Sequence, residues 1–230
     1  MLKASLFDAP LEKAFLQQNV LTADLRLVTI NLDVKFNDHK ISRLGPPQVG
    51  AISPHSFIAI WEEKLIHAEL LKTKYHPLLP SGMKIAYSWA YLWRVNPKKN
   101  LSFLTFECFL DPKQPIIDMD IETGEGLFSK SFSFEDEFIH IGTEDEDFLF
   151  QRADANDGLP SRYVKEKKIN YDNHNLVVAS DLGIKVHLPS LKAGELAQLQ
   201  FVIAGGADPT ANWFAVDPRP QDILLQAGCK

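Results

Sequence analysis

Short segments with alternating apolar and polar residues follow one another through most of this chain, and turn signals separate them. After residue 82 the segments are 83–95, 101–110, 115–122, 127–134, 137–142, 175–180, 184–188, 196–204 and 212–217. Alternation with a period of two is typical of strands that bury one face. Because these strands succeed one another without intervening helices, the sequence predicts a mainly β protein: an antiparallel β-sandwich or a flattened barrel.

Two further features sharpen this prediction. The spacer NPKKN between residues 95 and 101 has the length of a hairpin loop, so we expect 85–94 and 101–110 to pair antiparallel. Residues 24–36 form a long strand whose even-numbered positions are mostly apolar. With 230 residues, 45% of them hydrophobic, the chain can form one globular domain over 1–230 with its own core.

Two segments instead have helical spacing. Residues 57–75 place Ile58, Trp61 and Leu65 on one side, which predicts one substantial helix of about 57–75. A short N-terminal helix is predicted after Asp8, a capping residue, with Pro10 in its first turn.

The sequence also predicts where the protein is found. Its first 20 residues lack the apolar core and cleavage site of a secretory signal. No apolar run approaches the roughly 20 residues that span a bilayer. The chain has only two cysteines, Cys108 and Cys229. We therefore expect a soluble cytoplasmic protein that is not bound to a membrane.

Negative charge is concentrated in an acidic band, residues 116–158, which holds 13 carboxylates against Lys130 and Arg152. Because carboxylates repel phosphates, this band argues against nucleic-acid binding and fits a cation or a basic protein. Its densest part, TEDEDFLFQRADANDGLP (143–160), does not match the helix–loop–helix calcium pattern. Three interpretations stay open here: an irregular calcium site, a surface for a basic partner, and a solvated loop.

The segment IIDMDIE contains the first candidate catalytic residues. A strand would place Asp118, Asp120 and Glu122 on one face, with neighbouring carboxylates about 7 Å apart. In a cleft, their repulsion would raise one carboxyl pKa and provide a general acid. On an edge strand, the same charges would prevent aggregation. A third candidate, His140, would share a strand face with Asp136, which could orient its imidazole.

Residues 87–93, YSWAYLW, suggest a binding surface. Tyr87, Trp89, Tyr91 and Trp93, here called the aromatic row, would share one face of a strand. An exposed row of this kind stacks against sugars or flat apolar ligands, or anchors a protein partner, whereas a buried row fills the core. We expect one end to be buried and the end near Arg94 to reach a cleft.

Together these features predict a binding protein that engages a protein partner or a small apolar or sugar-like ligand. It would use the aromatic row (Tyr87, Trp89, Tyr91 and Trp93) and the acidic band. The alternative is a small cofactor-independent enzyme, a cyclase, isomerase or hydrolase, in which Asp118, Asp120 and His140 perform acid–base chemistry in an aromatic-lined pocket. No metal-binding spacing of histidines or cysteines is present in the sequence.

Overall fold

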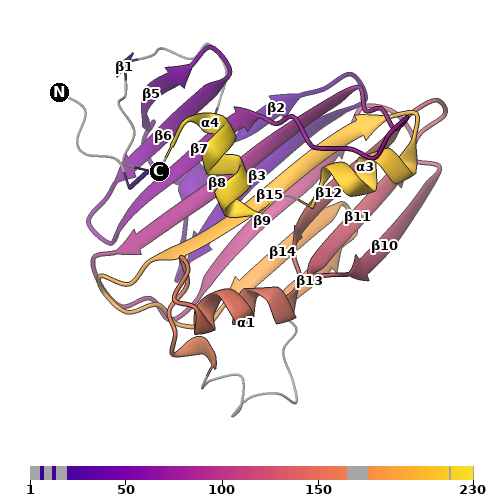
Figure 1. The fold of residues 1–230 in the computed structure, drawn as a ribbon. Helices are drawn as coiled ribbons and strands as arrows, with labels where there is room; N and C mark the ends of the chain where they lie inside the picture. The colour runs from indigo at the N-terminus through magenta and orange to yellow at the C-terminus, as the bar shows by residue number, and fades with distance from the viewer. Residues whose placement is uncertain (1–5, 8–11, 14–19, 165–175, 218, 230) are drawn as a thin grey trace.

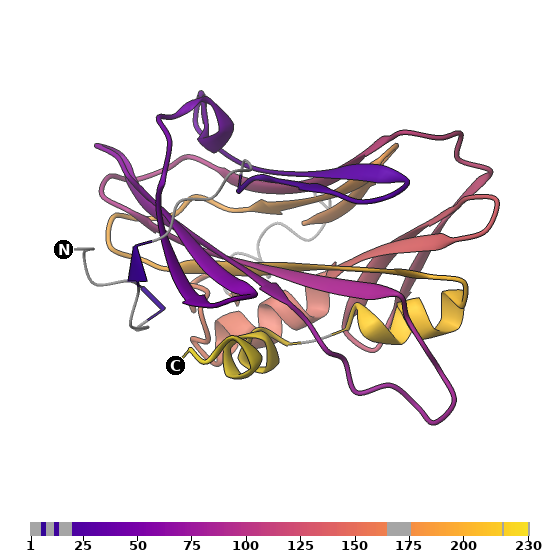
Figure 2. The same cartoon turned by 90° about the horizontal axis from the view of Figure 1, so that it is seen from above.

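Two antiparallel sheets pack face to face in the computed structural model, which describes residues 6–7, 12–13, 20–164, 176–217 and 219–229. Strands account for 50% of the structure and helices for 14%, so the predicted mainly β sandwich is confirmed. Figure 2 shows the two layers edge-on, with helices on the outer side of the larger sheet. This arrangement gives the larger sheet two covered faces and the smaller sheet one.

In the described part of the chain, the larger sheet has nine strands. In spatial order they are β1 (Glu12–Lys13), β5 (Gln48–Ser53), β6 (Ser56–Glu62), β7 (Ile66–Lys74), β8 (Tyr87–Pro97), β15 (Ala197–Gly206), β12 (Phe138–Glu144), β11 (Leu127–Ser133) and β10 (Asp118–Gly124). The smaller sheet runs β13 (Val177–Ser180), β14 (Gly183–Leu188), β9 (Leu104–Pro112), β3 (Val28–Phe36) and β2 (Thr22–Asp24), with β4 (His39–Lys40) beside β3. A short 3₁₀ turn, η1 (Ile41–Arg43), follows β4.

Each side of the larger sheet carries its own apolar cluster. Alternate residues of β3 (Val28, Ile30, Leu32, Val34, Phe36) are buried between the sheets, as the alternation of 24–36 predicts. On the outer side, residues such as Ile58, Leu92 and Val202 pack beneath α3 (Pro209–Ala215) and α4 (Pro220–Ala227). Because both faces are covered, the central strands are apolar at even and odd positions alike.

The predicted helix over 57–75 is wrong. These residues form β6 and β7, which pair from Ser56↔Thr73 to Glu62↔His67 around a turn closed by the Glu63 N–H and the Ile66 carbonyl. A strand buried on both faces is apolar at consecutive positions, and such a run contains helical spacings by coincidence. Of the predicted N-terminal helix, Glu12–Lys13 form a strand, and Asp8, Pro10 and the remainder lie outside the described residues.

The predicted hairpin between 85–94 and 101–110 is also wrong. Both segments are strands, but β8 pairs with β7 and β15 in the larger sheet, whereas β9 pairs with β3 and β14 in the smaller one. The spacer crosses from one layer to the other, and Leu101 pairs with Leu191 on the way. A loop length that permits a hairpin does not require one, because each strand joins the neighbours that bury its own faces.

Helices form in two segments for which the sequence predicted no helix. Residues 212–217, predicted as a strand, lie mostly in α3, whose start is fixed by Pro209 and by the Asp208 carboxylate accepting from the Ala211 N–H at 3.1 Å. The middle of the acidic segment 143–160 forms α1 (Glu146–Asp154). None of the helices in the described part of the chain is long and apolar enough to cross a bilayer.

Candidate functional site

The aromatic row lies on the inner face of the larger sheet, facing the smaller one. Tyr91 and Trp93 are completely buried, and the Trp93 ring lies 5.7 Å from that of Trp61. Tyr87 and Trp89 are only partly buried. The row therefore has one buried and one accessible end, as predicted, but the orientation is reversed: the end near Arg94 is buried and the Tyr87 end is accessible.

Lys72 flanks the accessible end on the β7 side. It lies opposite Tyr91 in the β7–β8 register, and its Nζ is 5.7 Å from the Tyr91 ring centroid and 5.5 Å from that of Trp89. Nζ donates a hydrogen bond of 3.3 Å to the Thr22 carbonyl. Burial lowers the pKa of Lys72, because the charged ammonium loses water that the rings and one carbonyl only partly replace.

A polar network flanks the same end on the other side. The Tyr87 hydroxyl donates to Glu137 Oε1 at 2.8 Å, and the Arg26 guanidinium donates to Glu137 Oε2, also at 2.8 Å. Asp136 adds a second carboxylate to Arg26 at 3.1 Å. Because Arg26 precedes β3 and Glu137 precedes β12, this network ties the two sheets together at the accessible end of the row.

Gly205 leaves the space that the Tyr87 ring occupies. The two residues are opposite in the β8–β15 register, and a Cβ built on Gly205 would lie 2.2 Å from the ring. Only a residue without a side chain leaves room for the ring to lie across β15 and reach Glu137.

The candidate acid–base residues do not come together. Asp118 and Asp120 are exposed on the outer edge strand β10, where Asp118 Oδ1 accepts from the Met119 N–H at 2.9 Å and Asp120 Oδ1 from the Ile121 N–H at 2.8 Å. His140 lies on the outer face of the sheet, 1% exposed, and burial lowers its pKa to about 4. An imidazole with this pKa is neutral at pH 7.

Four carboxylates of the acidic segment, residues 144–147, take part in the fold. Asp145 caps α1 by accepting from the Phe148 N–H at 2.9 Å, and Glu146 and Asp147 occupy the first turn, where the helix dipole favours negative charge. Glu144 is buried in an ion pair with Arg152. The described residues contain no group of three His, Cys, Asp or Glu side chains placed to hold a metal ion.

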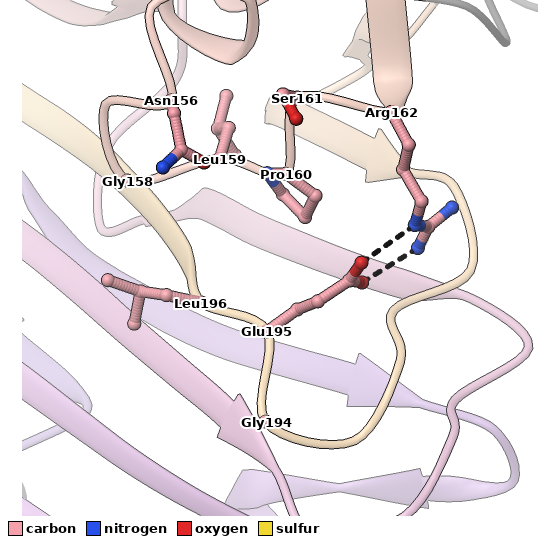
Figure 3. A pocket seen from close by; sticks show the side chains of 9 residues that line it. All are labelled: Asn156, Gly158, Leu159, Pro160, Ser161, Arg162, Gly194, Glu195 and Leu196. Atoms are coloured by element: carbon pink, nitrogen blue, oxygen red, sulfur yellow. Dashed lines mark hydrogen bonds and ion pairs between the residues drawn. The ribbon is translucent and has the colours of Figure 1, made fainter.

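A pocket of about 390 Å³ lies beyond the end of α1 (Figure 3). Residues 156, 158–162 and 194–196 line it, and none of them belongs to the aromatic row or to the acid–base candidates. The Arg162 guanidinium meets the Glu195 carboxylate along one wall, with both N–O contacts at 2.9 Å. Since these two charges neutralise each other, they contribute little attraction to a charged ligand in the pocket.

The comparison with known proteins gives no functional lead: no protein-family model matches the chain, and a search of curated proteins found no match. Lys72, Arg26 and Glu137 were not singled out from the sequence. Charged residues near strand ends are common on protein surfaces. Only the pairing of β7 with β8, and the contacts of Glu137 with Tyr87 and Arg26, show that these three residues border the aromatic row.

Proposed function

We propose that this protein binds a small flat ligand carrying an anionic group, at the Tyr87 end of the aromatic row. The observation that supports this most directly is the position of Lys72 over Trp89, with both side chains partly accessible. A stacking face beside a cation is suited to a planar ring with a carboxylate or similar group.

The electrostatics of Lys72 favour an anion over a neutral ligand. In the described part of the chain its hydrogen bond goes to a carbonyl, whereas Arg26 is engaged by Asp136 and Glu137. An anion within reach of Nζ would offset the desolvation that lowers the pKa of Lys72. The fully buried Tyr91 and Trp93 would position this end without contacting the ligand.

Binding of 2-naphthoate, measured by calorimetry, tests the proposal, and 2-naphthalenemethanol is the neutral counterpart. Lys72→Met should weaken naphthoate binding about tenfold or more, as expected for a charge-assisted contact, and leave the alcohol unchanged. Lys64→Met is the control, because Lys64 is exposed in the turn between β6 and β7, at the opposite end of β7 from the register partner of Trp89. No binding of either compound at millimolar concentration, or equal effects of the two lysine variants, would rule the proposal out.

A cofactor-independent enzyme is the second candidate, and the lowered pKa of Lys72 favours it. A lysine whose pKa is lowered by burial acts more readily as a base or as a nucleophile toward a carbonyl than an exposed lysine does. The test is borohydride trapping: a carbonyl analogue such as 2-naphthaldehyde should label Lys72 in preference to the exposed Lys74. Equal labelling of the two lysines would contradict a special reactivity.

The acidic band provides a third possibility, a basic protein partner. Asp118, Asp120 and Glu122 are exposed side by side along one face of β10. Attraction to a positively charged surface would act there without a pocket and would weaken with salt. Replacing all three with their amides should therefore reduce binding to a basic protein such as lysozyme at low ionic strength, and unchanged binding would argue against this role.

A further inference from the structure

Glu69 and Arg94 hold the main chain of Leu6 on the outer face of the larger sheet. The two residues are directly opposite in the β7–β8 register. The Leu6 N–H donates to both carboxylate oxygens of Glu69, each at 2.9 Å, and the Arg94 guanidinium donates to the Leu6 carbonyl. Glu69 thus accepts from the N–H of Leu6 and Arg94 donates to its carbonyl, two groups that every residue except proline carries.

Phe7 fixes the segment beside these contacts. Its side chain is fully buried, in the apolar cluster between the larger sheet and helices α3 and α4. The Arg94 guanidinium carbon lies 4.5 Å from the centroid of the Phe7 ring, so one side chain contacts both the carbonyl of Leu6 and the ring of Phe7. The site therefore recognises a main chain at one residue and an aromatic side chain at the next.

A chain of polar contacts fixes the Glu69 carboxylate. His67 Nε2 is 2.7 Å from Glu69 Oε1, and its Nδ1 contacts Glu62, which is paired with Lys98. Arg94 Nε donates to Gln198 at 2.6 Å. Glu69 is 0% exposed, and burying a carboxylate is costly unless it is fully hydrogen-bonded. Apolar residues at these positions would pack against the Leu6–Phe7 segment without that cost. The presence of Glu69 and Arg94 instead favours a role in recognising a peptide.

We propose that this face is a binding site for a short peptide in which an aromatic residue follows a residue bound through its main chain, and that Leu6 and Phe7 fill it in cis. Glu69 and Arg94 contact only main-chain atoms of Leu6, so selectivity for a peptide sequence comes from the apolar cluster that surrounds the Phe7 ring. Because the tethered segment is present at a high effective concentration, a free peptide competes only when the segment is weakened. This site lies on the opposite face of the sheet from Lys72 and is independent of the function proposed there.

Thermal unfolding of Phe7→Ala tests this inference. The probe is the acetylated and amidated peptide LKASLFDAPL, residues 2–11, and the control is the same peptide with Phe7 replaced by alanine. At 100 times its dissociation constant, the probe should raise the Tm of the variant by about 5 °C or more. It should raise the Tm of the unmodified chain by less than about 1 °C, because the site is already filled.

A chain lacking residues 1–7 gives a second measurement, with no tethered occupant at all. If either altered chain is unstable alone, recovery of cooperative unfolding on refolding with the probe counts for the inference, and failure to recover counts against it. Equal shifts with probe and control peptide, or no shift at 1 mM probe in both altered chains, would overturn it. Arg94→Met in the Phe7→Ala background should abolish the shift, since it removes the donor to the carbonyl.

Discussion

The Lys72 ammonium lies 5.5 Å from the centroid of the Trp89 ring, at the point where the aromatic row changes from buried to accessible. A cation over an indole contributes roughly 0.5–2 kcal/mol, more as water is excluded. The contact therefore lies at the boundary between the buried core and the accessible end of the row. Trp93, two positions beyond Tyr91 on the same face, is wholly within the core.

Alanine substitutions should separate the two ends of the row. Trp93→Ala should lower the free energy of unfolding by about 3–5 kcal/mol, because it leaves a cavity against Trp61. Trp89→Ala should cost less than about 2 kcal/mol, since its ring is only partly buried. Urea titrations of both variants measure the difference. Equal losses would contradict the described burial.

The buried pair Glu144–Arg152 gives a second prediction. Arg152→Met should destabilise the protein by about 3–5 kcal/mol, because it leaves the Glu144 carboxylate buried and unpaired. Adding Glu144→Leu should recover much of this loss, and a double-mutant cycle would measure the coupling. Lys113→Met is the control: its pair with Asp24 is exposed and should cost at most about 1 kcal/mol. Additive losses in the cycle would contradict a coupled pair.

Stability should fall in acid because of His140. Burial lowers its pKa from 6.5 to about 4, so between these pH values the unfolded chain binds a proton that the folded chain does not. The free energy of unfolding should decrease by about 3 kcal/mol as the pH falls through this window. Denaturant titrations from pH 7 to pH 4 should show a shallower slope for His140→Leu.

His67 should act in the opposite sense. Hydrogen bonding to Glu69 is the main cause that raises its pKa, so its contribution is fully present below pH 6.5 and disappears as the pH rises through the folded pKa. His67→Gln should therefore remove the gain in stability that appears as the pH falls through the folded pKa to 6.5, and should leave the slope below pH 6.5 unchanged. Identical slopes for the two histidine variants would contradict these assignments.

The edge strand β10 should be protected by its own aspartates. The Phe134 N–H donates to the Glu137 carbonyl, so the even-numbered residues of β11 hydrogen-bond to β12 and the odd-numbered ones face β10. These odd-numbered residues lie opposite Asp118 and Asp120 in the β10–β11 register. The N–H groups of Met119 and Ile121 therefore point away from β11. Asp118 and Asp120 accept from these two donors. A strand arriving at this edge meets engaged donors and negative charge.

Replacing both aspartates with alanine should therefore promote self-association, measured by light scattering after size-exclusion chromatography. Asparagines at the same positions retain acceptors without charge and should have an intermediate effect. Glu122→Ala, on the same face, removes charge without freeing a donor. If the double alanine variant elutes and scatters like the unmodified protein, the edge is not protected in this way.

The sequence alone determined where most strands lie, because side-chain direction alternates along an extended chain and half-buried strands record this in their residues. The alternating positions of β3 and of the segments that became β10 and β11 follow from it. The alternation disappears where both faces are covered, and for that reason β6 and β7 resembled a helix. Asp145 and Asp208 are helix-capping signals that the sequence contains, but neither was used to predict a helix.

Only the tertiary structure decided which sheet each strand joined, which end of the aromatic row stayed accessible, and which charges were buried. Strand partners are chosen by burial of faces over the whole domain, so the local spacer between β8 and β9 could not specify them. Glu69 and Glu144 look like surface carboxylates in the sequence. Glu69, for example, contacts Leu6, which is 63 residues away in the sequence, and contacts of this kind leave no local pattern.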